Sequence, residues 1–446
     1  MNNLKFLIKL LKRLLDYINN NALFKVASFN STSVLVRIIS GFLTSKAIAI
    51  FVGPEGMALI GNLRNFLSSA HSFAILGLYN GVVKYVAEFK NNTIELSKTI
   101  STSFYLGLTS TIIVSVFCYL NANYLNELIF ETYNYSYVFR IIALALPFYT
   151  LNMFCFSIIT GFSKYKTLLV INIIGQILGL LITLILIWKN SIDGALVSVV
   201  ITPSVVFLIT LFGIINRRNL TPLIKIENVS INTIKNLSAF SLMALLTAIV
   251  LPLVSILIRN YIIDNIGMKE AGFWEGMSRI SNYYLMFVNS LLALYILPRF
   301  AEINNKKEFR KEVFDFYKTI MPVFALGLLA VYLLRPFIVS IVFSNEFKPM
   351  EELFGWYLLG DFFKVLSIVI AYQFLAKRMF WHYIITEIFS FSFIYFASIY
   401  FIDLYGVKGA TIAHFVSYVM YFALILLILS RTLFGVIPEN IDKENN

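Results

Sequence analysis

The chain has 446 residues, of which 59% are hydrophobic and only 13% charged, and its mean hydropathy is +0.79. A soluble domain carries about 25% charged and about 45–50% apolar residues, so this composition excludes a soluble protein. The formal net charge is +12, but the basic residues fall mostly between hydrophobic segments, where they orient a membrane protein. We therefore expect membrane lipids around the chain and no nucleic-acid partner.

The N-terminal 27 residues are too basic and too periodic to be a transmembrane span. Residues 4–19 place four basic residues and one acidic residue on one helical face and leucines on the other. No small-residue cleavage site follows, which argues against a cleaved signal peptide. We predict an amphipathic helix over residues 1–27 that lies on the cytoplasmic surface.

Hydrophobic runs long enough to cross a bilayer recur about twelve times along the rest of the chain. The predicted spans are 28–50, 65–86, 100–120, 138–161, 167–188, 194–215, 236–258, 273–298, 317–344, 353–376, 381–402 and 408–430. They divide into an N-terminal six-helix bundle (28–216), a cytoplasmic linker (217–235) and a C-terminal six-helix bundle (236–430). A cytoplasmic tail (431–446) completes an all-α membrane fold.

The loop charges orient these spans. Most of the 36 lysines and arginines lie in the loops on the side that holds both termini. The opposite loops are assigned only Lys189, Arg259, Lys269, Lys348 and Lys408. By the positive-inside rule we expect both termini of this multi-pass membrane protein to be cytoplasmic.

The two bundles are related by an internal repeat with an offset of about 215 residues. Gly61-x-x-Arg64 recurs as Gly276-x-x-Arg279, and Gly194-Ala195 recurs as Gly409-Ala410. Repeats with an even number of spans share one topology and are related by an axis along the membrane normal. The interface between the repeats is where we expect a substrate site.

Three predicted spans carry polar stripes with residues spaced three or four apart, which places them on one helical face. The stripes are Asn30, Ser33, Arg37, Ser40 and Thr44 in the first span, Arg64, Ser68 and His71 in the second, and Glu275, Arg279, Asn282, Met286 and Asn289 in the eighth. A charged side chain at mid-bilayer costs about 2.5–3.5 kcal/mol and normally faces a lumen or a partner. The pattern predicts a positively charged lumen lined by these stripes.

Structural roles compete with this interpretation at several positions. Glu275 and Arg279 can pair along their own helix, and Asp361 with Lys364 is interpreted as a structural ion pair. Arg335 and Glu387 can pair across helices, or Arg335 can reach the interface. The isolated His71 and His414 are interpreted as hydrogen-bonded packing residues, and the buried Cys118 and Cys155 as bystanders. Arg37 has no acidic residue on its helix, so no such role explains it.

A cationic lumen without an external binding domain suits a polyanionic lipid headgroup. Arginine binds phosphate oxygens through a planar fork and stays charged. No nucleotide-binding motif is present, so energy must come from an ion gradient, the membrane potential or consumption of the product. The candidates for coupling or gating are Glu275, Asp361, Lys364 and Glu387, with H⁺ or Na⁺ as the ion and no other cofactor.

The sequence also resembles the Wzx-type polysaccharide flippases, in the branch of O-antigen translocases and enterobacterial-common-antigen (lipid III) flippases of the MOP exporter superfamily. The resemblance covers about residues 28–430 and is carried by the stretches Phe51-Val-Gly-Pro-Glu-Gly56, Tyr79-Asn-Gly-Val-Val-Lys-Tyr-Val-Ala87, Ser241-Leu-Met-Ala-Leu-Leu246, Gly272-Phe-Trp-Glu-Gly276, Tyr295-Ile-Leu-Pro298 and Gly360-Asp-Phe-Phe-Lys-Val365.

This resemblance implies a V-shaped, MATE-like pair of six-helix bundles that opens alternately to each side. It implies a substrate of undecaprenyl-pyrophosphate bearing an oligosaccharide, and it implies that a polysaccharide polymerase and a chain-length regulator act alongside. Arg37, Arg64 and Arg279 occupy places comparable to arginines that matter in related lipid II flippases. With Ser33, Ser40 and Asn282 they form the predicted binding set for pyrophosphate and glycan.

Two rival functions remain open at this point. A multidrug antiporter of the same superfamily would be expected to carry acidic residues in the first span, which here holds Arg37 and Lys46 and no acid. A membrane polysaccharide polymerase or ligase would need a long periplasmic loop and a catalytic constellation, and the sequence offers neither. We therefore expect a transporter that is not an enzyme.

Overall fold

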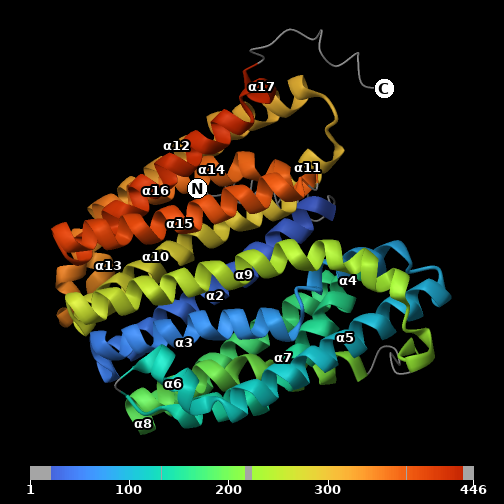
Figure 1. The fold of residues 1–446 in the computed structure, drawn as a ribbon, viewed down its shortest axis with the longest axis horizontal. Helices are drawn as coiled ribbons and strands as arrows, with labels where there is room; N and C mark the ends of the chain where they lie inside the picture. The colour runs from blue at the N-terminus through green and yellow to red at the C-terminus, as the bar shows by residue number, and fades with distance from the viewer. Residues whose placement is uncertain (1–21, 132, 216–222, 378, 435–446) are drawn as a thin grey trace, which may run out of the picture.

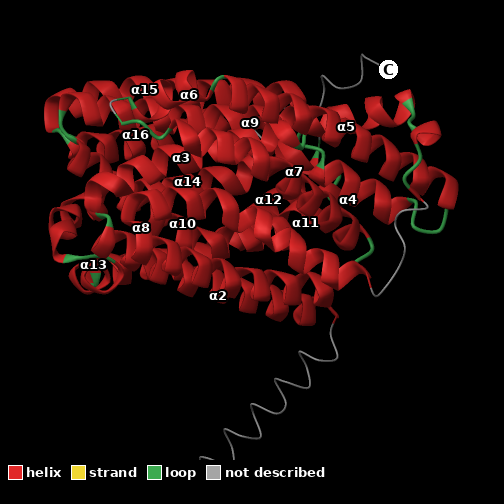
Figure 2. Ribbon diagram, turned by 90° about the horizontal axis from the view of Figure 1, so that it is seen from below, coloured by secondary structure: helices red, strands yellow, loops and turns green. Residues whose placement is uncertain are grey.

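The computed structural model describes residues 22–131, 133–215, 223–377 and 379–434. The predicted surface helix over residues 1–27 lies mostly outside these ranges, and so does most of the tail over 431–446. Every regular element in the described ranges is a helix (Figure 2). The first span is longer than expected, because its helix already begins at Ala22.

The helices of the N-terminal half are α2 (Ala22–Phe51), α3 (Gly53–Ala74), α4 (Tyr79–Glu88), α5 (Thr93–Leu120), α6 (Ala122–Phe130), α7 (Ser136–Gly161) and α8 (Tyr165–Ile215). The C-terminal half comprises η2 (Ile226–Asn228), α9 (Ile231–Asn265), α10 (Met268–Leu291), the π-helical turn η3 (Leu292–Ile296), α11 (Leu297–Glu302), α12 (Lys306–Leu333), α13 (Arg335–Val342), η4 (Asn345–Leu353), α14 (Phe354–Ala376), α15 (Phe380–Tyr405), α16 (Val407–Ile428) and α17 (Ser430–Leu433).

Ten of the described helices are long and apolar enough to cross a membrane, and α3 with α4, bent by 41°, forms an eleventh span. The helix α8 is broken at Asn190 and Ser191, where Ser191 has a positive φ of 47°. Its two arms fold back on each other, since a Cβ at Gly179 in the first arm would lie 2.4 Å from the Thr202 side chain in the second. Counting the arms separately gives the twelve spans predicted from the sequence.

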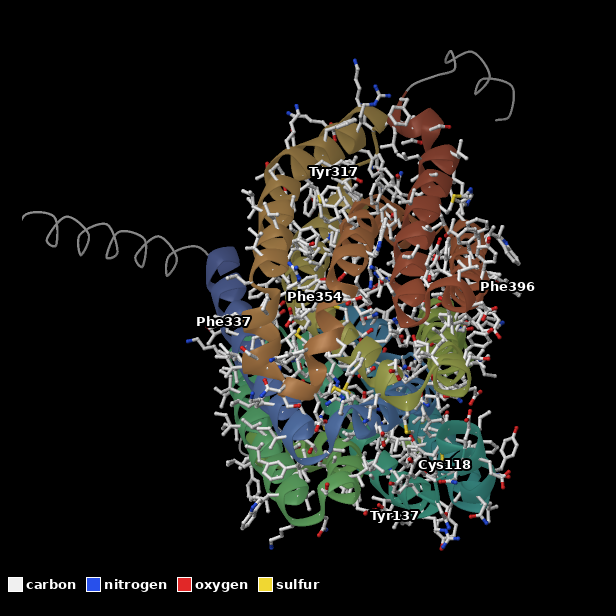
Figure 3. The ribbon with its side chains drawn as sticks, turned by 90° about the vertical axis from the view of Figure 1, so that its left-hand side faces the viewer. Cys118, Tyr137, Tyr317, Phe337, Phe354 and Phe396 are labelled. Carbon is white, nitrogen blue, oxygen red and sulfur yellow. The ribbon has the colours of Figure 1, made fainter. Side chains whose placement is uncertain are left out.

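The two halves of the chain lie side by side, and their long helices run roughly along the long axis of the molecule. Figure 1 shows the blue and green helices on one side, the orange and red ones on the other, and α2, α3, α9 and α10 where they meet. Viewed along that axis in Figure 3, Phe396 projects from the periphery and Phe354 lies inside. Phe396 is 67% exposed, as expected for a side chain that faces lipid.

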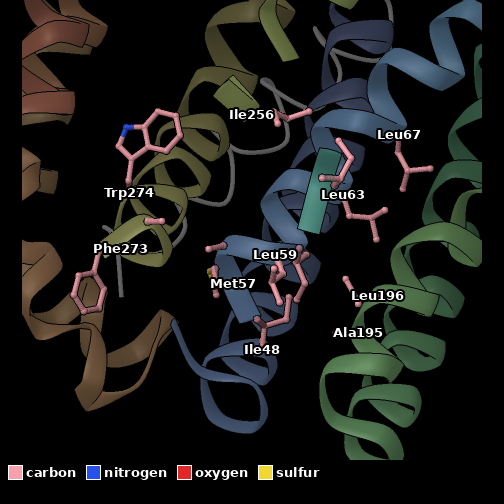
Figure 4. Packing of buried hydrophobic residues seen from close by; sticks show 14 of the residues in the cluster. Ile48, Met57, Leu59, Leu63, Leu67, Ala195, Leu196, Ile256, Phe273 and Trp274 are labelled. Atoms are coloured by element: carbon pink, nitrogen blue, oxygen red, sulfur yellow. The ribbon is translucent and has the colours of Figure 1, made fainter. Parts of the chain in front are cut away.

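The halves pack closely through α3 and α10, near the predicted periplasmic end. A Cβ at Gly272 in α10 would lie only 2.0 Å from the Pro54 carbonyl oxygen of α3, so this crossing requires glycine. A Cβ at Gly61 would lie 2.6 Å from the Glu275 carboxylate. Figure 4 shows Leu63 of α3 and Trp274 of α10 within the same buried cluster. This end of the molecule is therefore closed by direct contact between the repeats.

Candidate functional site

A cavity of about 580 Å³ lies among α2, α3, α7, α8 and α10, so it draws on both halves of the chain. The face of α2 that carries Arg37, Ser40 and Thr44 lines it, as the predicted stripe requires. Its polar lining from the other helices is Arg64, Ser68, His71, Ser72, Tyr149, Gln176, Thr183, Ser198, Thr202 and Tyr283.

The fixed charge of the cavity is positive. Arg37 and Arg64 both line it, and none of the described lining residues is an aspartate or glutamate. No described carboxylate forms an ion pair with either arginine. Two guanidinium groups in a cavity with no carboxylate among its described lining favour an anion, because their planar forks match phosphate or carboxylate oxygens.

Tyr283 joins the two halves at the cavity wall. Its hydroxyl lies 3.0 Å from Ser45 Oγ on α2, and its ring packs edge-on against Phe42. Gly41 makes room for this contact, since a Cβ there would lie 2.4 Å from the tyrosine ring. The glycine in α2 therefore allows α10 to approach the arginine-bearing helix.

Arg279 does not line the cavity, contrary to the expectation that three arginines share one chamber. Its Nε donates to Glu275 Oε1 at 3.0 Å, so the pair suggested by their i, i+4 spacing is present. The opposite oxygen of Glu275 accepts from Arg259 Nη2 at 2.6 Å. One carboxylate thus pairs with two guanidinium groups, and this ion pairing holds Arg279 outside the cavity lining.

Arg259 is the residue whose location differs most from the prediction. The sequence pattern assigns it to an outer loop, but it lies inside α9 and is 2% exposed. The apolar run ends at residue 258, so the arginine resembles a boundary residue. The helix instead continues to Asn265, and Glu275 and Asn62 accept hydrogen bonds from the buried guanidinium. Neither contact has a local sequence signal.

The remaining predicted binding residues divide in the same way. Ser40 lines the cavity, whereas Ser33 is buried outside the lining and Asn282 is exposed outside it. The structure thus brings together three of the six predicted residues, namely Arg37, Arg64 and Ser40. Their role in binding remains a prediction.

Several lining residues do not belong to the predicted binding set. His71 lines the cavity, as its place on the predicted stripe of the second span requires, and it also packs within the fold by stacking on Tyr149 with ring centroids 3.6 Å apart. Gln176 contributes an amide from α8. The sequence does contain a pattern that indicates this face of α8. Gly175, Gly179 and Thr183 repeat every four residues and so mark a narrow face of small residues.

The C-terminal half contains a second polar cluster centred on Asp361, whose side chain is fully buried. It accepts from Ser281 Oγ at 2.5 Å and from the Tyr284 hydroxyl, and it lies 3.0 Å from His414 Nε2. The predicted ion pair with Lys364 is therefore wrong, since histidine and hydroxyl groups from α10 and α16 hold the carboxylate instead. His414 is hydrogen-bonded, as expected, but it is not isolated, because its partner is this buried acid.

Lys364 and Glu387, the remaining candidates for coupling or gating, contact tyrosines, and so does Arg335. The Lys364 ammonium lies 5.3 Å from the centroid of the Tyr418 ring. Glu387 accepts from the Tyr421 hydroxyl at 3.3 Å, and Arg335 lies over the Tyr332 ring. No ion pair joins Arg335 to Glu387 among the described residues.

Comparisons with known proteins agree with this architecture. Residues 47–352 match the polysaccharide biosynthesis protein family. The chain is 29% identical over 404 residues to the lipid III flippase of Escherichia coli (strain K12), covering 90% of this chain and 97% of that protein. It is 24% identical over 383 residues to a putative O-antigen transporter of Shigella flexneri, covering 81% and 87% of the two chains.

Solved structures with the same fold include an inward-facing MATE-family multidrug transporter of the MOP superfamily. Its TM-score is 0.74 at 13% identity, covering 90% of this chain and 98% of that one. The lipid II flippase MurJ in an inward closed conformation gives a TM-score of 0.68 at 15% identity, covering 91% and 87%. The all-helical arrangement is thus shared with these two structures, and through its match over residues 47–352 the chain belongs to the polysaccharide biosynthesis protein family.

Proposed function

We propose that this multi-pass membrane protein is a flippase that moves an undecaprenyl-pyrophosphate-linked oligosaccharide from the cytoplasmic to the periplasmic leaflet. The substrate is an O-antigen or related surface-glycan repeat unit. The observation that carries the proposal is the cavity with Arg37 and Arg64 and no acidic residue among its described lining. The relatives named as lipid III flippase and O-antigen transporter support it.

Physical chemistry explains why such a lipid needs a protein. Each bare hydroxyl costs about 4–8 kcal/mol to move into hydrocarbon, so a sugar chain on a pyrophosphate meets a barrier of tens of kcal/mol. The polar cavity replaces part of the lost hydration, and its two arginines compensate the phosphate charge. The hydroxyl and amide groups of Ser40, Thr183 and Gln176 are available to sugars.

We propose that the protein lies in the bacterial inner membrane, which is supported by the flippase relatives. We also propose that both termini are cytoplasmic, because most of the basic residues are assigned to loops on the side of the termini. A polymerase and a chain-length regulator that consume the flipped repeat unit are the partners that this direction of transport calls for.

We propose proton coupling through the cluster around Asp361. Its carboxylate already has three hydrogen-bonding neighbours, which leaves little room for a sodium shell but suits exchange of a proton with His414. The groups that face Asp361 are Ser281 and Tyr284 on α10, Tyr357 and Lys364 on its own helix α14, and His414 and Tyr418 on α16.

A multidrug antiporter is less consistent with the cavity. A cationic drug would be repelled by Arg37 and Arg64, and no described lining carboxylate offsets them. A site for cations would need the opposite charge at the same wall.

Replacing Arg37 by alanine is expected to abolish export of the surface glycan while leaving the amount of protein in the membrane normal. Arg37→Lys, which retains the charge but lacks the fork, should keep partial export. Arg140→Ala is the matched control, because Arg140 is an exposed arginine of α7 that does not line the cavity. Unimpaired export by Arg37→Ala would contradict the proposal.

A further inference from the structure

Three arginines and one glutamate form a buried cluster between the cavity and the predicted periplasmic end. Glu275 pairs with both Arg259 and Arg279, and it also interacts electrostatically with Arg64, which lines the cavity. The four side chains together carry two excess positive charges. Arg279 lies one helical turn from Tyr283 at the cavity wall, so the cluster begins where the cavity ends.

The same cluster holds the two repeats together. Arg259 Nη1 of α9 donates to Asn62 Oδ1 of α3 at 2.7 Å, and Asn62 Nδ2 donates to Asn260 Oδ1 at 2.7 Å and to the Ile129 carbonyl at 3.0 Å. Asn62 is 1% exposed, and both polar atoms of its buried side chain have hydrogen-bond partners. Asn62 and Ile129 belong to the N-terminal half and the other two residues to the C-terminal half. We call these four residues the inter-repeat lock.

The cluster also contains donors without acceptors. Both Nη groups of Arg279 and the Nε of Arg259 are buried and have no hydrogen-bond partner among the described residues. An unsatisfied buried donor costs about 1–3 kcal/mol, and more when it belongs to a charged group. One glutamate is thus insufficient for the guanidinium groups around it, and the cluster is poised to accept a second anion.

We propose that Arg259, Glu275 and Arg279 are positioning residues that release the inter-repeat lock when an anionic headgroup occupies the cavity. A phosphate beside Arg64 supplies acceptors to Arg279 and competes with Glu275 for it. Glu275 then loses one of its two partners, and the network that aligns Arg259 with Asn62 weakens. Phosphate binding at one end of the cluster thereby favours separation of the repeats at the other end.

This inference rests on the proposed function, because the releasing anion is the pyrophosphate of the lipid. It goes further in naming the residues that transmit binding to the closed end. The energetics follow from linkage: a ligand that prefers the open state loses part of its affinity to opening, so a weaker lock must make its apparent binding tighter.

The test uses the full chain in nanodiscs of phosphatidylethanolamine and phosphatidylglycerol, with inorganic pyrophosphate as the probe. Spin labels are placed at Asn123→Cys in α6 and Lys408→Cys in α16, in a background with Cys118→Ala and Cys155→Ala. Asn123 and Lys408 are exposed residues at the predicted periplasmic ends of opposite halves. Double electron–electron resonance measures the distance between the spin labels, and isothermal titration calorimetry measures pyrophosphate binding separately.

We expect pyrophosphate to lengthen the distance between the labels. Asn62→Ala removes a hydrogen bond to a charged group, worth about 1.5–3 kcal/mol, so it should lengthen the distance between the labels without ligand. It should also lower the midpoint of the binding curve, the pyrophosphate concentration at half-saturation, about tenfold or more. Arg259→Lys replaces the two nitrogens that donate separately to Asn62 and Glu275 with a single ammonium, so it should weaken the lock and shift both quantities in the same direction. Glu95→Gln is the matched control, because it breaks an exposed ion pair with Lys98 far from the lock.

A merely structural role for the lock would give unfolded protein or weaker binding, never tighter binding. The inference is overturned if pyrophosphate binds by calorimetry without changing the distance between the labels. It is equally overturned if folded Asn62→Ala and Arg259→Lys bind with the midpoint of the parent protein. Absence of any pyrophosphate binding would instead refute the anion site of the proposed function, and the lock mechanism with it.

Discussion

Arg37 and Arg279 differ in what surrounds them, although both are arginines on polar helical stripes. Arg37 lines the cavity from α2, which contains no acidic residue. Its position could be predicted, because the helix sequence alone shows that no carboxylate on the same helix can pair with it. Arg279 is tied to Glu275, a pairing that the spacing also indicated. The role of Arg259 could not be predicted, because its partners on α3 and α10 meet it only in the fold.

Asp361→Asn is expected to abolish the response of transport to an imposed pH gradient. The substitution removes the carboxylate that faces His414, so a proton can no longer be exchanged between them. Flipping of a labelled lipid-linked oligosaccharide in proteoliposomes measures the effect, with and without the gradient. Glu387→Gln is the control, since Glu387 bonds to Tyr421 instead. A gradient response that survives Asp361→Asn would refute this assignment.

A carboxyl pair at the predicted periplasmic end gives a pH dependence of stability. Burial and the nearby Asp264 raise the pKa of Glu131 above its ordinary value. The folded state therefore holds a proton that the unfolded chain has released, and the free energy of unfolding should rise as pH falls through the raised pKa towards the ordinary one. Asp264→Asn should reduce this slope in thermal unfolding between neutral and mildly acidic pH. An identical slope in both proteins would show that the pair does not act this way.

At the scale of helices, the glycines of α10 decide how closely the repeats approach. Gly272 allows the Pro54 carbonyl of α3 to lie where a Cβ would be, and no side chain fits there without moving the backbone. The sequence reveals the glycine and its place in a resemblance motif, but not the helix it faces. Span positions were predictable because they follow from hydrophobic length, and this includes the break in α8, which falls at Asn190 and Ser191 between the predicted spans 167–188 and 194–215.

Gly272→Ala should destabilise the closed arrangement by about 1–3 kcal/mol, as overpacking does in well-packed interiors. A lowered melting temperature of the purified protein would register the change. Gly327→Ala is the matched control, because Gly327 lies inside α12 and a Cβ added there would have nothing within 4 Å. At that position alanine should be neutral or stabilising by up to about 1 kcal/mol. Equal melting temperatures for the two variants would contradict the close crossing of α3 and α10.

Across the molecule, the two repeats have related sequences but contain different polar sites. The N-terminal half contributes most of the open, positively charged cavity, whereas the C-terminal half contains the closed cluster around Asp361. The inter-repeat lock joins them at one end. The repeat offset predicted that Arg64 and Arg279 would be counterparts, and both indeed lie at the meeting of α3 and α10. Part of their different surroundings could be predicted, because Glu275 has no acidic counterpart in the first repeat. That Arg259 shares this carboxylate could not be predicted.

The most direct test of the central claim is the rate at which the purified protein flips a fluorescent undecaprenyl-pyrophosphate oligosaccharide in proteoliposomes. We predict that Arg37→Ala combined with Arg64→Ala lowers this rate by at least about tenfold, since each arginine offers a charge-assisted contact of about 1.5–3 kcal/mol. Arg140→Ala should leave the rate unchanged. A double variant that flips the lipid as fast as the parent protein would contradict the account.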